Sequence, residues 1–119
     1  MTKPKPLVPA QPAFPLSETT FLILVSLGSG PKHGYAIMKE VEALSQGRVL
    51  LSTGTLYGAI KRLLAEDWIH RLDLPEDGTD GRDRKSYELT VRGRKVLKAE
   101  TQRLKELVQI AVQRASEGA

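Results

Sequence analysis

The chain has 119 residues, of which 40% are hydrophobic and 27% charged, and it contains no cysteine. This length and composition are typical of one small soluble domain, and a chain of this size can take part of its core from a partner subunit. The absence of cysteine excludes disulfides, thiolate zinc sites and a cysteine nucleophile, and it agrees with a reducing compartment. The formal net charge of +4 mildly favours a polyanionic partner.

The distribution of charge and hydropathy along the chain narrows the setting further. No stretch approaches the ~20 apolar residues of a membrane span, and no apolar run typical of a secretory signal occurs near the N-terminus. Acidic residues dominate residues 66–80, whereas basic residues dominate residues 82–98. Such charge runs are most often solvated surface, so alone they identify no ligand. We expect a cytoplasmic protein without membrane association.

Two short helices are predicted after a proline-rich start. Residues 1–15 hold five of the seven prolines and are expected to form a flexible N-terminal tail. Ser17 can cap a first helix, which ends at the glycines and proline of residues 28–31. Residues 33–45 follow with a second helical pattern, whose expected apolar face comprises Tyr35, Ile37, Met38, Val41 and Leu44.

The third predicted helix begins at Ser52 or Thr53 and has an unusual outer side. Its expected buried stripe comprises Leu56, Ile60, Leu63 and Leu64. The opposite side begins with Gly54 and Gly58, although glycine costs about 1 kcal/mol relative to alanine inside a helix. Two glycines on one exposed face therefore require a functional or a packing reason.

A two-stranded hairpin and a long helix complete the predicted fold. Residues 68–74 and 85–90 read as strands joined by a polar loop rich in turn signals. Thr90 can cap a last helix over residues 91–116. The fold class is therefore mainly α with a small β-hairpin: a winged helix-turn-helix domain over residues 16–90 and a long C-terminal dimerisation helix over residues 91–119.

The small residues of the third helix are explained by this architecture. The second helix of a helix-turn-helix enters the major groove, and small side chains let its backbone approach DNA closely. Tyr57 has two interpretations: it packs at the edge of the core, or it presents its hydroxyl to a phosphate. The candidate DNA-binding residues are Ser52, Thr53, Gly54, Thr55, Tyr57, Gly58, Lys61 and Arg62 on this helix, with Arg82, Arg84 and Lys85 on the wing.

The last helix carries an apolar stripe that no later element can cover. Its expected dimerisation residues are Leu97, Thr101, Leu104, Leu107, Val108, Ala111 and Val112. Such a stripe is more often an intrachain packing face than a coiled-coil seam, because the heptad run is short. Since symmetric dimers are the commonest oligomers, a second copy of the chain is the natural cover.

Three motifs together resemble the PadR family of winged-helix transcriptional regulators. They are His33-Gly34-Tyr35, the run from Gly54 to Tyr57, and Tyr87-Glu88-Leu89-Thr90 followed by Gly93. The resemblance covers roughly residues 17–100 and implies the short subgroup with a single dimerisation helix. It also favours a phosphate contact for Tyr57.

The chain departs from the family pattern at two places. Gly58 replaces a common proline, and Asp67-Trp68 replaces a common Gly-Leu. Some short members bind flat aromatic compounds through a tryptophan of the last helix. The only tryptophan here is Trp68, outside that helix, so this type of sensing is not supported.

The sequence thus predicts a bacterial transcriptional regulator, acting as a repressor that binds a pseudo-palindromic operator as a homodimer. A small-molecule effector is possible but not identified, and no metal or cofactor is expected. The alternative is a winged-helix module that binds a protein through the same basic face. An enzyme is disfavoured, because His33 and His70 have no convergent catalytic or metal-binding partners in the sequence pattern.

Overall fold

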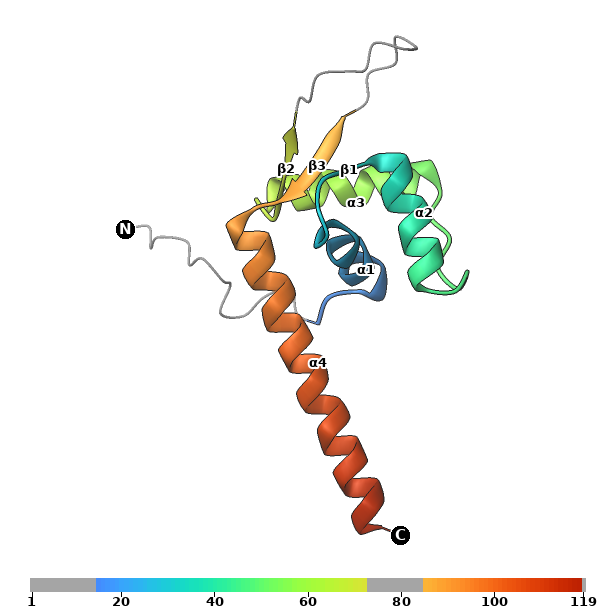
Figure 1. The fold of residues 1–119 in the computed structure, drawn as a ribbon, viewed down its shortest axis with the longest axis vertical. Helices are drawn as coiled ribbons and strands as arrows, with labels where there is room; N and C mark the ends of the chain where they lie inside the picture. The colour runs from blue at the N-terminus through green and yellow to red at the C-terminus, as the bar shows by residue number, and fades with distance from the viewer. Residues whose placement is uncertain (1–14, 73–84, 119) are drawn as a thin grey trace, which may run out of the picture.

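The computed structural model describes residues 15–72 and 85–118 of the chain. In order, these residues form α1 (Glu18–Leu27), β1 (Lys32–His33), α2 (Gly34–Leu44), α3 (Thr53–Ala65), β2 (Ile69–Leu72), β3 (Ser86–Leu89) and α4 (Val91–Glu117). Figure 1 shows α1, α2 and α3 gathered beside the sheet, while α4 projects far beyond them. The expected tail lies, except for Pro15, outside the described residues. A mainly helical winged-helix fold is therefore confirmed.

The sheet has one strand more than the sequence predicted. Its order is β1-β3-β2, and both pairs are antiparallel. The added strand has two residues, which pair with Tyr87 and Ser86. The Nδ1 atom of His33 lies 2.9 Å from the hydroxyl oxygen of Ser86. His33 is therefore part of the sheet edge, and its strand is too short to produce a readable alternation of apolar and polar residues.

The core lies where α1, α2 and α3 meet the sheet and the start of α4. Its buried side chains are Ile23, Leu24, Leu27, Ile37, Val41, Leu56, Ala59, Ile60, Leu63, Trp68, Ile69, Tyr87, Leu89 and Val96. Three residues expected on buried faces are exposed instead: Tyr35 at 68%, Leu44 at 46% and Leu64 at 38%. The buried face of α2 is narrower than predicted: its buried residues are only Gly34, Ile37 and Val41, which lie on one stripe of the helix.

α3 ends in the backbone conformation that usually requires a glycine, although the residue at that position is Asp67. The Trp68 N–H donates to the Leu63 carbonyl over 3.0 Å, and the Asp67 N–H donates to the Leu64 carbonyl over 3.0 Å. These two bonds define a Schellman motif, and Asp67 adopts the left-handed conformation that it requires, with φ of 63°. The departure from the family's glycine therefore leaves the turn intact, since aspartate tolerates this region better than most residues.

The start of α4 is held directly against this turn. The Thr90 N–H donates to the Trp68 carbonyl over 3.1 Å, and the Thr90 hydroxyl donates to the Asp67 carbonyl over 2.6 Å. The same hydroxyl caps α4 by accepting from the Gly93 N–H at 2.9 Å. A β-carbon at Gly93 would overlap the Trp68 carbonyl oxygen. Only glycine permits this approach, so α3 and α4 are joined backbone to backbone.

A buried carboxylate fixes α4 a second time, about two turns further on. Glu100 is 1% exposed and accepts hydrogen bonds from Arg103, at 2.6 Å and 2.8 Å, and from the Leu16 N–H at 3.0 Å. The hydrogen bonds from Arg103 hold the pKa of the Glu100 carboxyl below its ordinary value, against the opposing effect of burial. The Arg103 ion pair lies within α4, and the hydrogen bond from the Leu16 N–H ties this helix to the segment that precedes α1.

We predict that Glu100→Gln lowers the free energy of unfolding at neutral pH by about 2 kcal/mol, the typical worth of hydrogen bonds to a charged group. Because the folded pKa is depressed, this contribution is present above the ordinary pKa and is lost as the pH falls through the folded pKa. The difference between wild type and variant should shrink on acidification below about pH 4. Urea unfolding at several pH values measures it. Exposed Glu106 on the same helix provides the control Glu106→Gln, and equal losses in both variants would contradict the prediction.

Candidate nucleic-acid interface

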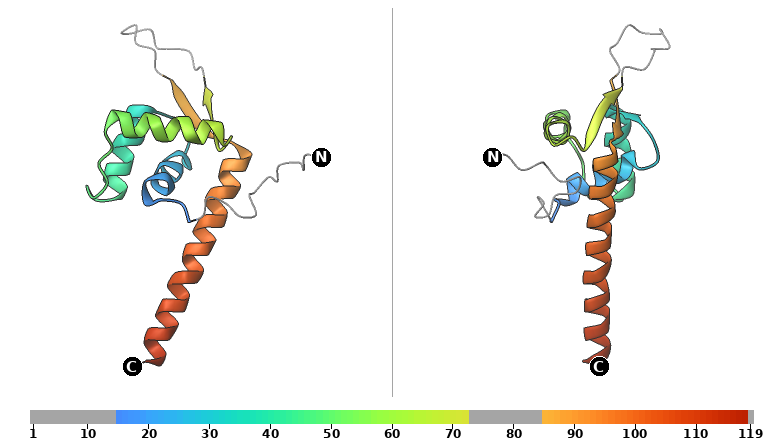
Figure 2. Two further views of the ribbon diagram at one scale, coloured as in Figure 1. Left: turned by 180° about the vertical axis from the view of Figure 1, so that it is seen from behind. Right: turned by 90° about the vertical axis from the view of Figure 1, so that its left-hand side faces the viewer.

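The outward side of α3 is a continuous exposed face. Leu56, Ala59, Ile60 and Leu63 occupy the buried side. The third-helix candidates lie on or next to the exposed side, where all are exposed except Gly58, which is half-buried: Ser52, Thr53, Gly54, Thr55, Tyr57, Gly58, Lys61 and Arg62. Seen from behind, α3 lies at the front of the domain, and seen from the side it lies at an outer edge (Figure 2). The described chain thus leaves this helix open along its length.

The two glycines of α3 face open space. A β-carbon at Gly54 would meet no atom within 4 Å, and one at Gly58 would meet only the Arg62 Nη1 atom at 3.9 Å. The alternative that Gly58 packs against a neighbouring helix is therefore wrong for the described residues. Glycine costs helix stability here without providing room for any described part of the chain. The room is available to a partner.

The first turn of α3 is ordered by its own side chains. Ser52 caps the helix, because its hydroxyl oxygen accepts from the Thr55 N–H at 3.1 Å. The Ser52 hydroxyl also donates to the Thr55 hydroxyl oxygen over 2.9 Å. The helix therefore begins where the sequence predicted, and its first-turn backbone is held in place while Thr53 and Gly54 stay exposed.

The charge on this face has one sign. Residues 52–65 include Lys61 and Arg62 but no aspartate or glutamate. Both cations are exposed. Acidic side chains return only at Glu66 and Asp67, after the helix has ended. An anionic partner can therefore approach α3 along its whole exposed length without meeting a carboxylate of the helix.

Tyr57 packs against the start of α2 and keeps part of its side chain exposed. The side chain is 46% exposed. Its hydroxyl oxygen would lie 2.5 Å from a β-carbon at Gly34, so the ring tip occupies the space that this glycine leaves at the start of α2. Tyr57 therefore packs at the contact between the two helices and still presents part of its surface outward.

The wing candidates are only partly visible. Arg82 and Arg84 lie outside the described residues. Lys85 is exposed and directly precedes β3. Across the neighbouring strands, His70 Nε2 lies 3.0 Å from Glu88 Oε1, which pairs a carboxylate near the wing with a histidine. Of the three basic wing residues, the described part of the chain thus includes only Lys85, at the start of β3.

One exposed pair on α2 was missed by the sequence prediction. Tyr35 was expected in the core, yet it is 68% exposed, and the Lys39 ammonium lies 5.8 Å from the centre of its ring. The amphipathic pattern counted tyrosine as an apolar residue, which concealed it. The available signal was the four-residue spacing of an aromatic residue and a lysine, which places both on one helix face.

The described residues offer little to a metal or a membrane. Among residues 15–72 and 85–118, no three His, Asp or Glu side chains lie close enough together to hold a metal ion. None of the helices in this part of the chain has the length and apolar character needed to cross a bilayer.

Comparison with known proteins decides the family. The model of the transcriptional regulator PadR-like family matches residues 23–99. The chain belongs to this family. The resemblance seen in the three sequence motifs is thereby confirmed. The matched residues 23–99 include the whole of α3.

Solved structures share the fold of this PadR-like chain. A PadR family transcription regulator from Clostridium difficile is 26% identical and superposes with a TM-score of 0.68, covering 82% of this chain and 97% of that one. Bacillus subtilis PadR, solved in complex with operator DNA, is 25% identical with a TM-score of 0.58, covering 67% of this chain and 44% of that one. The match to the Clostridium protein spans nearly the whole of its chain, whereas the match to the Bacillus protein spans less than half.

A curated relative extends the comparison to a longer protein. An uncharacterized 37.1 kDa protein in transposon TN4556 of Streptomyces fradiae is 38% identical over 84 residues, which cover 71% of this chain. The chain spans only 22% of that protein's length. A segment similar to this chain therefore lies within that longer protein.

We predict that Gly58→Leu keeps or raises thermal stability, by up to about 1 kcal/mol, because leucine is a better helix former and the position is open. Gly93→Ala provides the contrast, since its β-carbon would overlap the Trp68 backbone. That variant should lose about 1–3 kcal/mol through overpacking. Thermal unfolding of both proteins measures the difference, and a melting temperature lowered in Gly58→Leu would show that the position is not open.

Proposed function

We propose that the chain is a sequence-specific DNA-binding transcriptional repressor that acts in the cytoplasm as a homodimer on a pseudo-palindromic operator. The single observation that carries the proposal is the α3 face, which is exposed, free of acidic side chains and opened by Gly54 and Gly58. A helix with this surface can lie deep in the major groove, where its first residues meet base edges. The proposed activity needs binding alone and no covalent chemistry.

Duplex DNA suits this face better than a protein partner does. Protein interfaces usually rely on buried aromatic or apolar anchors. The open side of α3 has small side chains, two cations and a half-exposed Tyr57, which match a phosphate-lined groove. Membership in a family of transcriptional regulators supports the same choice. Selection of bound duplexes from a random pool tests it, and recovery of a half-site repeated with twofold symmetry is the expected result.

The proposed dimer rests on the exposed apolar side chains of α4. The second half of α4 projects beyond the other helices and the sheet (Figure 1), and residues 105–118 are all exposed. Large apolar side chains remain uncovered there: Leu107 at 48%, Val108 at 61%, Ile110 at 62% and Val112 at 64% exposure. Ile110 was not among the predicted dimerisation residues, so the apolar surface is wider than the expected stripe. A second copy of α4 would remove this surface from water.

The predicted dimerisation stripe is not uniform. Leu97 packs partly against the core of its own domain, and Leu104 is half-buried. The Thr101 hydroxyl donates to the Leu97 carbonyl over 2.8 Å, within the helix. The exposed residues Leu107, Val108, Ala111 and Val112 follow later in α4. We therefore place the centre of the proposed interface in the second half of the helix.

The α3–α4 junction suits a mechanism in which dimer geometry sets DNA spacing. Because Thr90 and Gly93 hold α4 against the end of α3, a change in the angle between two α4 helices would move the two α3 helices relative to each other. Two half-sites one helical turn apart require the recognition helices to lie about 34 Å apart. A signal that alters this distance would release the operator. Repression follows from occupancy of the operator alone.

We predict that Val108→Glu yields a folded monomer. The side chain is exposed within its own chain, so the substitution should leave the fold intact, whereas an unpaired carboxylate buried between two helices is strongly unfavourable. Gln109→Glu adds the same charge one residue away, off the apolar stripe, and should remain dimeric. Light scattering at micromolar concentration measures both. A monomeric wild type would refute the dimer.

We predict that Gly58→Leu separates folding from DNA binding. The added side chain should collide with the groove and weaken binding of the selected duplex tenfold or more, equivalent to about 1.4 kcal/mol. The melting temperature should not fall, for the reason given above. Fluorescence anisotropy with the selected duplex measures affinity. A stable variant with unchanged affinity would mean that this side of α3 does not enter the groove.

A further inference from the structure

The exposed face of α3 continues onto α2. α2 begins beside α3 and then runs away from it, so only its first turns are close to the recognition helix (Figure 1). The Tyr57 hydroxyl lies over Gly34, the first residue of α2. No side chain at Gly34 separates the two helices, because a β-carbon there would stand 2.5 Å from that hydroxyl oxygen. The outer surfaces of α3 and α2 are therefore contiguous at this point.

Tyr35 is the next residue along α2, and it points outward with Lys39. It is 68% exposed, and the Lys39 ammonium lies 5.8 Å from its ring centre. This cation–π contact orders two long side chains that would otherwise be free in water. Side chains of a helix lean toward its N-terminus, so both lean toward the end of α2 that meets α3. Tyr35 thus offers a hydroxyl donor, and Lys39 offers a positive charge beside it.

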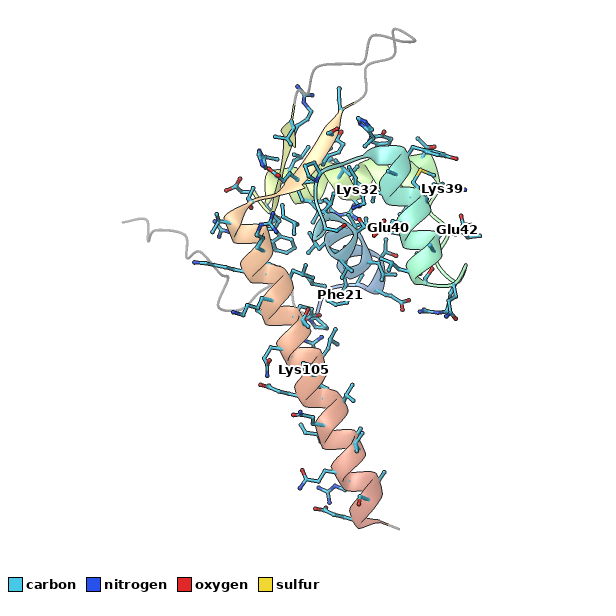
Figure 3. All side chains as sticks on the ribbon, in the orientation of Figure 1. Phe21, Lys32, Lys39, Glu40, Glu42 and Lys105 are labelled. Atoms are coloured by element: carbon cyan, nitrogen blue, oxygen red, sulfur yellow. The ribbon has the colours of Figure 1, made fainter. Side chains whose placement is uncertain are left out.

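The neighbouring charges define how far this surface extends. Lys32, just before α2, is not part of it, because its ammonium donates to the Ser26 carbonyl at 2.6 Å and the Ser29 hydroxyl at 2.8 Å. Figure 3 shows Lys39 and Glu42 on the side of α2 away from α1, and Glu40 on the side toward α1. Glu42 lies seven residues after Tyr35, about 10 Å further along the helix, and three residues, about 4.5 Å, after Lys39. On this side of α2, Lys39 thus precedes Glu42 and lies closer to the end of the helix that meets α3.

We propose that Tyr35 and Lys39 of α2, together with Tyr57 of α3, bind the phosphate backbone at the edge of the major groove that α3 enters. This inference rests on the proposed DNA-binding function and adds to it residues outside the recognition helix and the wing. Hydroxyl and ammonium donors are the usual partners of phosphate oxygens and carry no base preference. The first helix of a helix-turn-helix also crosses the backbone beside the groove. The surface therefore adds affinity and orientation, while α3 supplies sequence choice.

Because backbone contacts do not depend on sequence, a labelled duplex of about 30 base pairs with arbitrary sequence is a sufficient probe. We would measure its affinity for the full-length wild type, Lys39→Gln, Tyr35→Phe and Tyr35→Ala over a series of salt concentrations. Lys105→Gln, on the exposed surface of α4 and away from α3 (Figure 3), removes the same charge and is the matched control. Thermal unfolding and light scattering confirm that each variant is folded and keeps the wild-type assembly.

Lys39→Gln should reduce the slope of log affinity against log salt by about 0.9 per subunit, the effect of one lost phosphate contact. Tyr35→Phe should weaken binding about threefold to tenfold, and Tyr35→Ala should weaken it further, because Lys39 also loses its support. The Lys105→Gln slope should equal that of wild type.

Three outcomes overturn the inference in distinguishable ways. If wild type binds the duplex and the α2 variants match Lys105→Gln, α2 makes no backbone contact, and the proposed DNA binding stands. If wild type binds no duplex even at low salt, the proposed function itself fails. A Tyr35 variant that alters base preference in duplex selection, with an unchanged salt slope for Lys39→Gln, also contradicts a backbone role.

Discussion

The close contact between the end of α3 and the start of α4 is the constraint on which the other features depend. Thr90 bonds to the carbonyls of Asp67 and Trp68, and Gly93 lies where any β-carbon would overlap the Trp68 backbone. Gly93 and the Trp68 carbonyl are both backbone, so their close approach cannot relax by a rotamer change. It requires the left-handed turn at Asp67 and a cap at Thr90. The orientation of the exposed α3 face relative to α4 follows from it.

Glycine has two opposite uses in this chain. At Gly34 and Gly93 its missing side chain lets another part of the protein come close: the Tyr57 hydroxyl in one case and the Trp68 carbonyl in the other. At Gly54 and Gly58 nothing of the described chain uses the space. Since each helical glycine carries a cost of about 1 kcal/mol, only the first two are explained by folding. The proposed DNA groove gives the other two a physical reason.

The sequence predicted those elements in which buried side chains recur at a regular spacing. The helices α1, α3 and α4 follow from their apolar spacing and from the caps Ser17, Ser52 and Thr90. The strand β1 was missed because two residues cannot show a period. Tyr35 was misplaced because an aromatic ring suits both a core and a binding surface. Glu100 was not recognised as buried, because one of its partners is the backbone of Leu16, 84 residues earlier.

The two attachments of α4 explain how one helix can serve both the domain and a partner. Gly93 fixes its first turn against Trp68, and the Leu16 N–H bond to Glu100 fixes its third, so the helix is held over about 10 Å of its length. Two separated attachments resist tilting, which a single cap would permit. Past Leu104 the helix is exposed, and no other described part of the chain covers its apolar side chains. Residues 94–104 include neither glycine nor proline, so no hinge residue separates the attached part of α4 from its exposed part. In the proposed dimer, a rotation of the exposed part would therefore also move the attached part and, with it, α3.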